Sequence, residues 1–315
     1  MEYVILMVSL VGIVLGADWL VAGAVSIAKK YKVSDFVIGA AIVGVGTSMP
    51  ELVVSFIGAV QGNADVAIGN VVGSNIFNVL GILGLTALFF PIAISKDNVK
   101  FEIPFCIAVS VLLMLLAMNF FNGTPATIGR PDGLILLLLF AFFMWYSFRR
   151  DMKNAQDSET SGQEEKVSIW MATGKVAVGL AVLITSCDFF VDNAVSVAKS
   201  FGVNDAFISL TLIACGTSLP ELAASVAAAF KKNTQLALGN IIGSNIFNIT
   251  LILGLSSQVM PLTSGGITIV DYIVMIAVVI ITLILGFKGR ISRAAGGFMF
   301  LCFAGYNWYL LSTQM

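Results

Sequence analysis

Two short stretches of the chain combine a carboxylate with hydroxyl groups at helical spacing. Residues 46–51 read Gly-Thr-Ser-Met-Pro-Glu, and residues 216–221 read Gly-Thr-Ser-Leu-Pro-Glu. On a helix, Thr47 and Glu51 share a face with Ser48 at its edge, so their oxygens converge. Pro50 has no N–H group and its ring crowds the carbonyl of residue 46, which predicts a kink or break in the helix. A cluster of hard oxygens at a helix break predicts a cation site.

Both glutamates lie inside long apolar runs. A charge at bilayer depth costs roughly 2.5–3.5 kcal/mol on insertion scales, so it is normally retained for a functional reason. Carbonyls freed at such a break are tolerated only against protein or a water-lined cavity. A structural alternative is that the glutamates are neutral or ion-paired and that the hydroxyls bond back to the preceding turn. The candidate ligands of this motif are Thr47, Ser48 and Glu51, with Thr217, Ser218 and Glu221 in the second copy.

A second motif also occurs twice. Residues 69–78 read Gly-Asn-Val-Val-Gly-Ser-Asn-Ile-Phe-Asn, and residues 239–248 differ only in having isoleucine for both valines. Its serine and final asparagine are four residues apart and therefore share one helix face. Helix–helix hydrogen bonding is the alternative role for these side chains. Because the pair is repeated, we expect ion contact from Ser74, Asn78, Ser244 and Asn248.

Composition places the chain in a membrane. Of its 315 residues 58% are hydrophobic and only 11% are charged, whereas soluble domains are about 25% charged. The absence of histidine excludes serine–histidine hydrolases and histidine metal sites. The four cysteines are scattered through apolar stretches, which favours packing roles over disulfides or a zinc site. The net charge of −1 suggests no nucleic-acid partner. The sequence implies the lipid bilayer as the surroundings of the chain and implies no protein partner.

Ten apolar runs are long enough to span a bilayer. We therefore predict an all-α integral membrane protein with ten transmembrane helices, at 3–28, 36–60, 66–90, 101–119, 132–149, 169–198, 206–230, 236–258, 269–287 and 294–312. The polar stretch between the fifth and sixth runs predicts a flexible linker.

The two halves of the chain are one unit used twice. Glu221 lies 170 residues after Glu51, and both copies of the second motif keep the same offset. Five helices are an odd number, so the second repeat must enter the membrane from the opposite side. With both termini outside, only Arg130 and Lys199 of the 17 basic residues fall on the outer side, as the positive-inside rule favours. We predict a first repeat at 1–149, a cytoplasmic linker at 150–168 and a second repeat at 169–315, forming one membrane domain.

These paired motifs resemble the two alpha-repeats of the sodium/calcium exchangers, in the cation/calcium antiporter superfamily. The resemblance covers nearly the whole chain and implies inverted five-helix repeats in a multi-pass cell-membrane protein. It implies a central calcium site at Glu51 and Glu221, with the backbone carbonyls of Thr47 and Thr217. It further implies sodium ligands and residues lining the centre, namely Ser48, Ser74, Ser218, Ser244, the carbonyls of Gly44 and Ala214, and Asn78 and Asn248.

The sequence therefore predicts an antiporter that exchanges Na⁺ for Ca²⁺, without a cofactor and without enzymatic activity. Many family members have aspartate where this chain has Asn248, and two glutamates balance one Ca²⁺ or two Na⁺. This departure leaves the ion ratio open and keeps H⁺/Ca²⁺ antiport as an alternative. A cation channel is a second alternative, against which the inverted repeat argues. A membrane enzyme is a third, and the chain offers no nucleophile–histidine pair for it.

Overall fold

A computed structural model of the chain describes residues 2–62, 64–118, 127–157, 168–201, 216–263 and 267–314. These residues are mostly helical. They form two compact units, one of residues 1–50 with 142–240 and one of residues 51–141 with 241–315. Each unit draws on both halves of the sequence.

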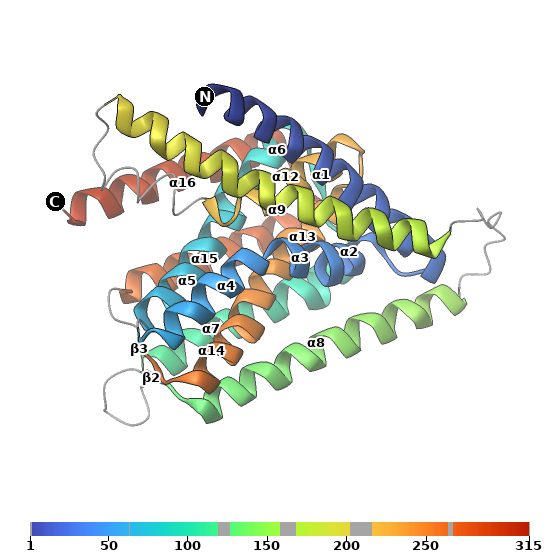
Figure 1. Ribbon diagram of the computed structural model, residues 1–315. Coiled ribbons are helices and arrows are strands. Elements are labelled where there is room, and N and C mark those ends of the chain that lie inside the picture. The colour runs from blue at the N-terminus through green and yellow to red at the C-terminus, as the bar shows by residue number, and fades with distance from the viewer. Residues whose placement is uncertain are drawn as a thin grey trace. The chain divides into compact units, whose positions relative to one another are not determined.

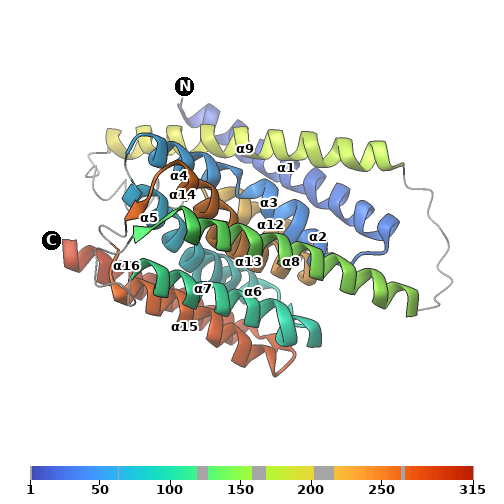
Figure 2. The same ribbon diagram turned by 90° about the horizontal axis from the view of Figure 1, so that it is seen from below.

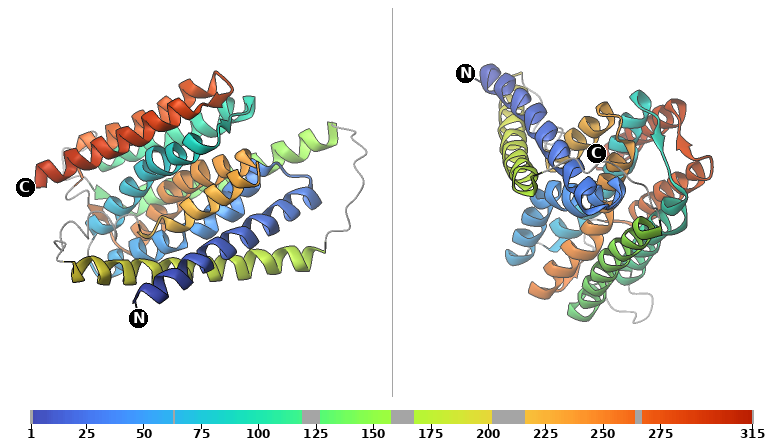
Figure 3. Two further views of the ribbon diagram at one scale, coloured as in Figure 1. Left: turned by 90° about the horizontal axis from the view of Figure 1, so that it is seen from above. Right: turned by 90° about the vertical axis from the view of Figure 1, so that its right-hand side faces the viewer.

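The first unit is built around two long helices, α1 (Glu2–Tyr31) and α9 (Ile169–Ser200), which lie side by side (Figures 1 and 3). A Cβ atom added at Gly16 would lie 2.9 Å from the carbonyl oxygen of Gly179, and one added at Gly23 would lie 2.7 Å from that of Ala172. Residue numbers rise along α1 as they fall along α9, so the helices run antiparallel. Small residues allow this close backbone approach.

The remaining helical segments of the first unit are short and interrupted. They are α2 (Asp35–Ile38), the π-helical segment η1 (Gly39–Gly44), α3 (Val45–Thr47) and α12 (Leu219–Phe230). Ser34 caps α2 by accepting a hydrogen bond from the Val37 N–H at 3.3 Å. Three helices continue from one unit into the other, namely α4 (Met49–Val60), α8 (Arg130–Asp157) and α13 (Thr234–Phe247).

The second unit contains the helices α5 (Ala64–Ile76), α6 (Gly84–Phe89), α7 (Ile103–Ala117), α14 (Leu253–Val259), α15 (Ile269–Gly286) and α16 (Arg293–Gln314). Figure 2 shows α7 beside α15, and α16 packs against α6. Its π-helical segments are η2 (Phe77–Leu83), η3 (Asn98–Glu102) and η5 (Asn248–Ile252). Asn78 and Asn248 thus both lie where α-helical geometry gives way to π-helical geometry.

The repeat is visible in how helices of the second unit pack. On α6, a Cβ atom added at Gly84 would lie 3.1 Å from the Gly296 carbonyl oxygen on α16. At the equivalent position on α14, one added at Gly254 would lie 3.2 Å from the Gly133 carbonyl oxygen on α8. The same glycine is therefore used in both repeats to bring a helix of the opposite repeat close.

Four described two-residue strands also form contacts between the two halves of the sequence. β1 (Ile92–Ala93) pairs antiparallel with β4 (Arg290–Ile291), and β2 (Thr127–Ile128) pairs antiparallel with β3 (Leu262–Thr263). β1 and β3 are equivalent positions of the repeat, and each pairs with a strand from the other half. The two halves are thereby tied to one another within this unit.

Seven described helices are long and apolar enough to cross a membrane, or eight if the bent pair Asp35–Thr47 and Met49–Val60 counts as one span. The predicted seventh span, 206–230, is described only from residue 216 onward. The count of ten therefore stays a prediction. The helix α8, which contains the predicted fifth span, continues to Asp157, into the stretch expected to be a flexible linker.

Candidate functional site

The helix breaks where proline predicts it. α3 ends at Thr47 and α4 begins at Met49, with a bend of 49° between the two parts. Ser48 lies between them with φ −82° and ψ 11°, and its equivalent Ser218 has φ −92° and ψ 9° just before α12. The predicted break is confirmed at the first motif, and the second motif adopts the same local conformation at its serine.

In both motifs a fully buried glutamate lies in the first turn of the helix that follows the serine. Glu51 and Glu221 both have 0% of their surface exposed. The Ser48 hydroxyl donates a hydrogen bond of 2.7 Å to Oε1 of Glu221. Within the described residues, Oε2 of Glu221 has no hydrogen-bond partner. A buried carboxylate oxygen left in this condition is a strong acceptor for a cation.

We did not predict from the sequence an asparagine that hydrogen-bonds to the backbone of each glutamate, which we call the asparagine brace. The Asn240 side-chain amide donates to the Glu221 carbonyl oxygen at 3.1 Å and to the Ser225 hydroxyl at 2.8 Å. In the first repeat, Asn70 donates to the Glu51 carbonyl oxygen at 3.3 Å and to the Ser55 hydroxyl at 3.0 Å. The identical asparagine and serine in both repeats were the available signal, since both pairs keep the same offset as the glutamates.

The threonines of the two motifs differ. Thr47 donates back to the Val43 carbonyl oxygen at 2.9 Å, and its hydroxyl lies 3.2 Å from Oδ1 of Asn240. The back-bond was the structural alternative for this residue. The Thr217 hydroxyl has no hydrogen-bond partner within the part of the chain that the structure describes. Because the Thr47 hydroxyl already hydrogen-bonds within the protein, its backbone carbonyl oxygen is the group that we expect to bind the ion.

Four buried asparagines of the second unit bond across the repeats. Asn78 donates to Oδ1 of Asn245 at 3.0 Å, and Asn248 donates to Oδ1 of Asn75 at 3.1 Å. Asn75 and Asn245 each donate to the other's backbone carbonyl oxygen, at 3.2 and 3.1 Å. We call these four residues the asparagine ring. Asn75 and Asn245 are further residues that the sequence analysis did not single out.

The other predicted ligands are placed as follows. Gly44 ends the π-helical segment η1 and is buried. Ser74, Ser218 and Ser244 are also buried. Ala214 lies outside the described residues. Of the predicted set, the structure brings Ser48 into contact with Glu221 and links Asn78 and Asn248 through their ring partners.

Three cysteines are described, and all three are free thiols, as the packing interpretation expects. Cys106 and Cys187 are buried and Cys302 is partly buried, whereas Cys215 lies outside the described residues.

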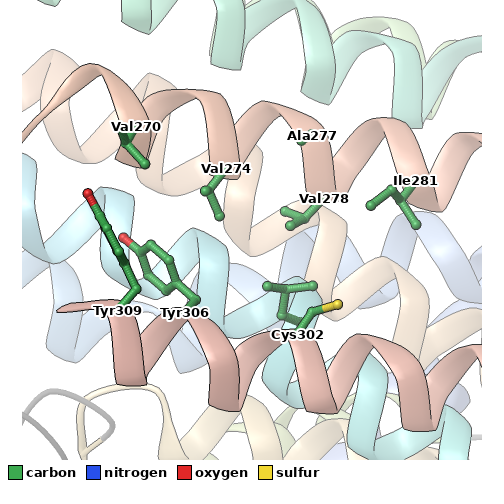
Figure 4. Close-up of a pocket in the computed structure, with 9 residues that line it drawn as sticks. Val270, Val274, Ala277, Val278, Ile281, Cys302, Tyr306 and Tyr309 are labelled. Atoms are coloured by element: carbon green, nitrogen blue, oxygen red, sulfur yellow. The ribbon is translucent and has the colours of Figure 1, made fainter. Parts of the chain in front are cut away.

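A separate cavity of about 320 Å³ lies between α15 and α16 (Figure 4). Valine, isoleucine, leucine and alanine side chains line most of it, together with Cys302, Tyr306 and Tyr309. The Tyr306 hydroxyl donates to Oδ1 of Asp271 at 2.6 Å. None of the predicted ion ligands lines this cavity, and its apolar lining does not suit a cation.

Comparison with known proteins decides the family. The sodium/calcium exchanger protein family matches residues 1–149 and 171–312. This chain belongs to the sodium/calcium exchanger family. A putative antiporter, CaxA from Alkalimonas amylolytica, is 38% identical over 98% of both chains. The sodium/calcium exchanger MaX1 from Methanosarcina acetivorans is 34% identical over 90% of both.

Solved structures agree with this exchanger assignment. The chain is similar to the sodium-calcium exchanger NCX_Mj soaked with Na⁺ and Sr²⁺, with a TM-score of 0.82 and 29% identity. The likeness covers 100% of this chain and 98% of that one. The exchanger is thus a membrane transporter whose family carries out cation/Ca²⁺ antiport, and the family predicted from its two motifs is confirmed.

Proposed function

We propose that this exchanger is a secondary active antiporter that couples Na⁺ entry to Ca²⁺ exit by alternating access, with Glu51 and Glu221 at its central ion site. The observation that carries the proposal is the duplicated arrangement around Glu51 and Glu221. In each repeat a fully buried glutamate follows a serine of the same motif, and an asparagine amide donates a hydrogen bond to the glutamate's own carbonyl oxygen. The names of MaX1 and NCX_Mj support sodium as the coupling ion.

The donor set is suited to both ions. Ca²⁺ takes six to eight oxygen ligands in flexible geometry. Two carboxylates would neutralise one Ca²⁺ or two Na⁺. Around them we propose serine hydroxyls, asparagine oxygens and backbone carbonyls, from Gly44, Thr47, Ser48, Ser74, Asn78, Ala214, Thr217, Ser218, Ser244 and Asn248.

Exchange rather than leak follows from the burial of charge. Without a cation, Glu51 and Glu221 would have to pass between inward and outward access as buried, charged carboxylates, at high cost. Bound Ca²⁺ or Na⁺ removes that cost, so only the loaded site switches between the two sides. The two ions compete for the same carboxylates, and this competition couples their movements.

The reciprocal contacts of the second unit support inverted repeats. Strands and glycines at equivalent positions each contact the other half of the chain. We propose ten spans in the cell membrane, with both termini outside and the 150–168 linker in the cytoplasm. This orientation follows the basic residues and places the binding site near the midplane, as inverted repeats with broken helices do.

Uptake of ⁴⁵Ca²⁺ by proteoliposomes tests the proposal. Vesicles loaded with Na⁺ and diluted into Na⁺-free buffer should accumulate Ca²⁺, whereas vesicles loaded with K⁺ should not. Glu51→Gln should abolish the Na⁺-driven uptake, because the neutral side chain removes half of the site's charge.

Three outcomes would contradict the assignment in different ways. Uptake that follows a pH gradient and ignores Na⁺ would make the exchanger a proton/calcium antiporter. Calcium flux without any counter-ion would indicate a channel. Full Na⁺-driven uptake by the Glu51→Gln variant would remove Glu51 from the site.

A further inference from the structure

Within the part of the chain that the structure describes, the asparagine ring leaves two oxygen atoms without hydrogen-bond partners. All four side chains are buried, with at most 1% of their surface exposed. Asn75 and Asn245 use both ends of their amides, since each donates through Nδ2 and accepts through Oδ1. Asn78 and Asn248 donate through Nδ2, but their Oδ1 atoms have no partner within the described residues.

The hydrogen bonds of the ring determine that Oδ1, and not Nδ2, is the atom of Asn78 and Asn248 that remains available. An asparagine amide can turn about its last bond and exchange its donor and acceptor ends. If Asn248 turned, its Oδ1 would face Oδ1 of Asn75, and two acceptors cannot form a hydrogen bond. Asn78 is held against Oδ1 of Asn245 in the same way. The orientation that leaves the oxygens free is therefore the one that the ring permits.

We infer that Asn75 and Asn245 are positioning residues of the ion site. Each holds an asparagine of the opposite repeat, Asn248 and Asn78 respectively, so that a carbonyl oxygen rather than an N–H group is presented to the cation. The inference rests on the proposed function, because it takes Asn78 and Asn248 as ligands.

The pairing is crosswise, and this gives the inference a specific signature. Oδ1 of Asn75 accepts a hydrogen bond from Asn248, 173 residues away in the other repeat, and not from Asn78, which is only three residues away. A general packing role for Asn75 would depend on neither partner in particular. A positioning role must depend on Asn248 and be indifferent to Asn78.

A double-mutant cycle tests this signature. Asn75→Leu keeps the size of the side chain but removes the acceptor for Asn248. We expect it to raise the half-saturating concentration of Na⁺ or Ca²⁺ by roughly tenfold, as the loss of a group that orients a metal ligand does. In an Asn248→Ala background no amide remains to be oriented, so the same substitution should change the half-saturating concentration by no more than about twofold.

The matched control uses Asn78. In an Asn78→Ala background, Asn75→Leu should retain its full effect of roughly tenfold. The reciprocal cycle, Asn245→Leu, should couple to Asn78→Ala and not to Asn248→Ala. The thermal stability of each purified variant is measured in parallel, and its change should be similar in every background.

Equal effects of Asn75→Leu in the native, Asn78→Ala and Asn248→Ala proteins would overturn the inference. So would coupling to Asn78 as strong as that to Asn248. Should Asn75→Leu fail to fold, Asn75→Ala removes the same acceptor with less steric demand and enters the same cycle. An active Glu51→Gln variant would overturn the proposed function itself, whereas an additive cycle with inactive Glu51→Gln would overturn only the positioning role.

Discussion

Asn240 and Lys231 lie nine residues apart, but only Asn240 has an equivalent in the first repeat that makes the same contacts. Asn240 and its equivalent, Asn70, make the same two hydrogen bonds behind their glutamates. Lys231 binds the Asp18 carboxylate on α1 at 2.6 Å, but the residue equivalent to Lys231 in the first repeat is Gln61. Asp188, the equivalent of Asp18, therefore cannot have the matching ion pair. The asparagine hydrogen bonds behind the two glutamates are therefore duplicated, whereas the ion pair of Lys231 with Asp18 has no equivalent in the other repeat.

The difference separates two kinds of requirement. Under the proposed function, an ion that is released to either side meets equivalent groups from both repeats, and the glutamate, serine and asparagine do occur in pairs. Contacts that only hold helices together need not be equal. We therefore expect substitutions of the two paired carboxylates to behave alike, and contacts that are not repeated to have small effects on exchange.

The largest effect is expected at the paired carboxylates. Glu221→Gln should abolish Na⁺-driven ⁴⁵Ca²⁺ uptake as completely as Glu51→Gln, because each removes one of two buried charges. Asp97→Asn, which neutralises an exposed carboxylate, serves as the control and should leave uptake unchanged. Uptake lost in only one glutamate variant would show that the repeats contribute unequally.

A smaller effect, on stability, is expected where α16 meets α6. A Cβ atom at Gly296 would lie 2.6 Å from the Leu88 backbone nitrogen and 2.7 Å from the Gly84 carbonyl oxygen. Gly296→Ala should therefore destabilise the protein by about 3 kcal/mol, the upper part of the usual range for overpacking.

The adjacent residue provides the control for this prediction. At Gly297 an added Cβ would meet only the end of the Leu88 side chain, at 3.3 Å. Gly297→Ala should lower the thermal unfolding temperature much less than Gly296→Ala does. Equal effects would mean that close backbone approach does not limit the packing of α16.

The asparagine braces should come next. Asn240→Ala removes two hydrogen bonds to Glu221 and Ser225 and should cost about 2 kcal/mol at about 1 kcal/mol for each bond. Asn70→Ala removes the same two bonds in the first repeat. Because Asn240 Oδ1 also lies 3.2 Å from the Thr47 hydroxyl, Asn240→Ala should be the more damaging of the two.

Thermal unfolding in detergent measures both variants. Substituting the hydroxyl partners, with Ser225→Ala and Ser55→Ala, should reproduce about half of each loss. A larger loss for Asn70→Ala would contradict the geometry described here.

The chemistry at the breaks was predictable from sequence because it is local. Pro50 and Glu51 are adjacent, so the break and the carboxylate follow from covalent structure and from the apolar surroundings. Asn75 was not predictable as part of the site, since its partners lie in the other repeat and only tertiary packing brings them together. A repeat shows which residues are equivalent, but not which of them meet.

The end of α8 illustrates the same limit. The polar composition after residue 149 predicts a linker, but the helix continues to Asp157. Asp151 is buried and accepts a hydrogen bond of 2.8 Å from the Ser34 N–H, just before α2. This contact between residues 117 positions apart stabilises a helical turn that its own sequence does not favour.

The smallest effect is expected at the ion pair between Lys231 and Asp18, which is not repeated in the other half of the chain. Lys231 and Asp18 are 33% and 53% exposed, and exposed ion pairs contribute only about 0.2–1 kcal/mol. Lys231→Gln gives the second repeat the residue that the first already has. It should lower the unfolding temperature slightly at low salt and not at about 1 M salt, where the Debye length is only about 3 Å.

Asp18→Asn should have a similar effect, and the double variant should be little worse than either, because all three lose the same ion pair. Na⁺-driven uptake should stay within about twofold of the native rate, because the loss of a small part of the folding stability leaves nearly all of the protein folded. A large change in uptake by Lys231→Gln would show that the ion pair is part of the transport cycle. The asymmetry between the repeats would then be functional, and the distinction between duplicated site contacts and dispensable edge contacts would fail at this position.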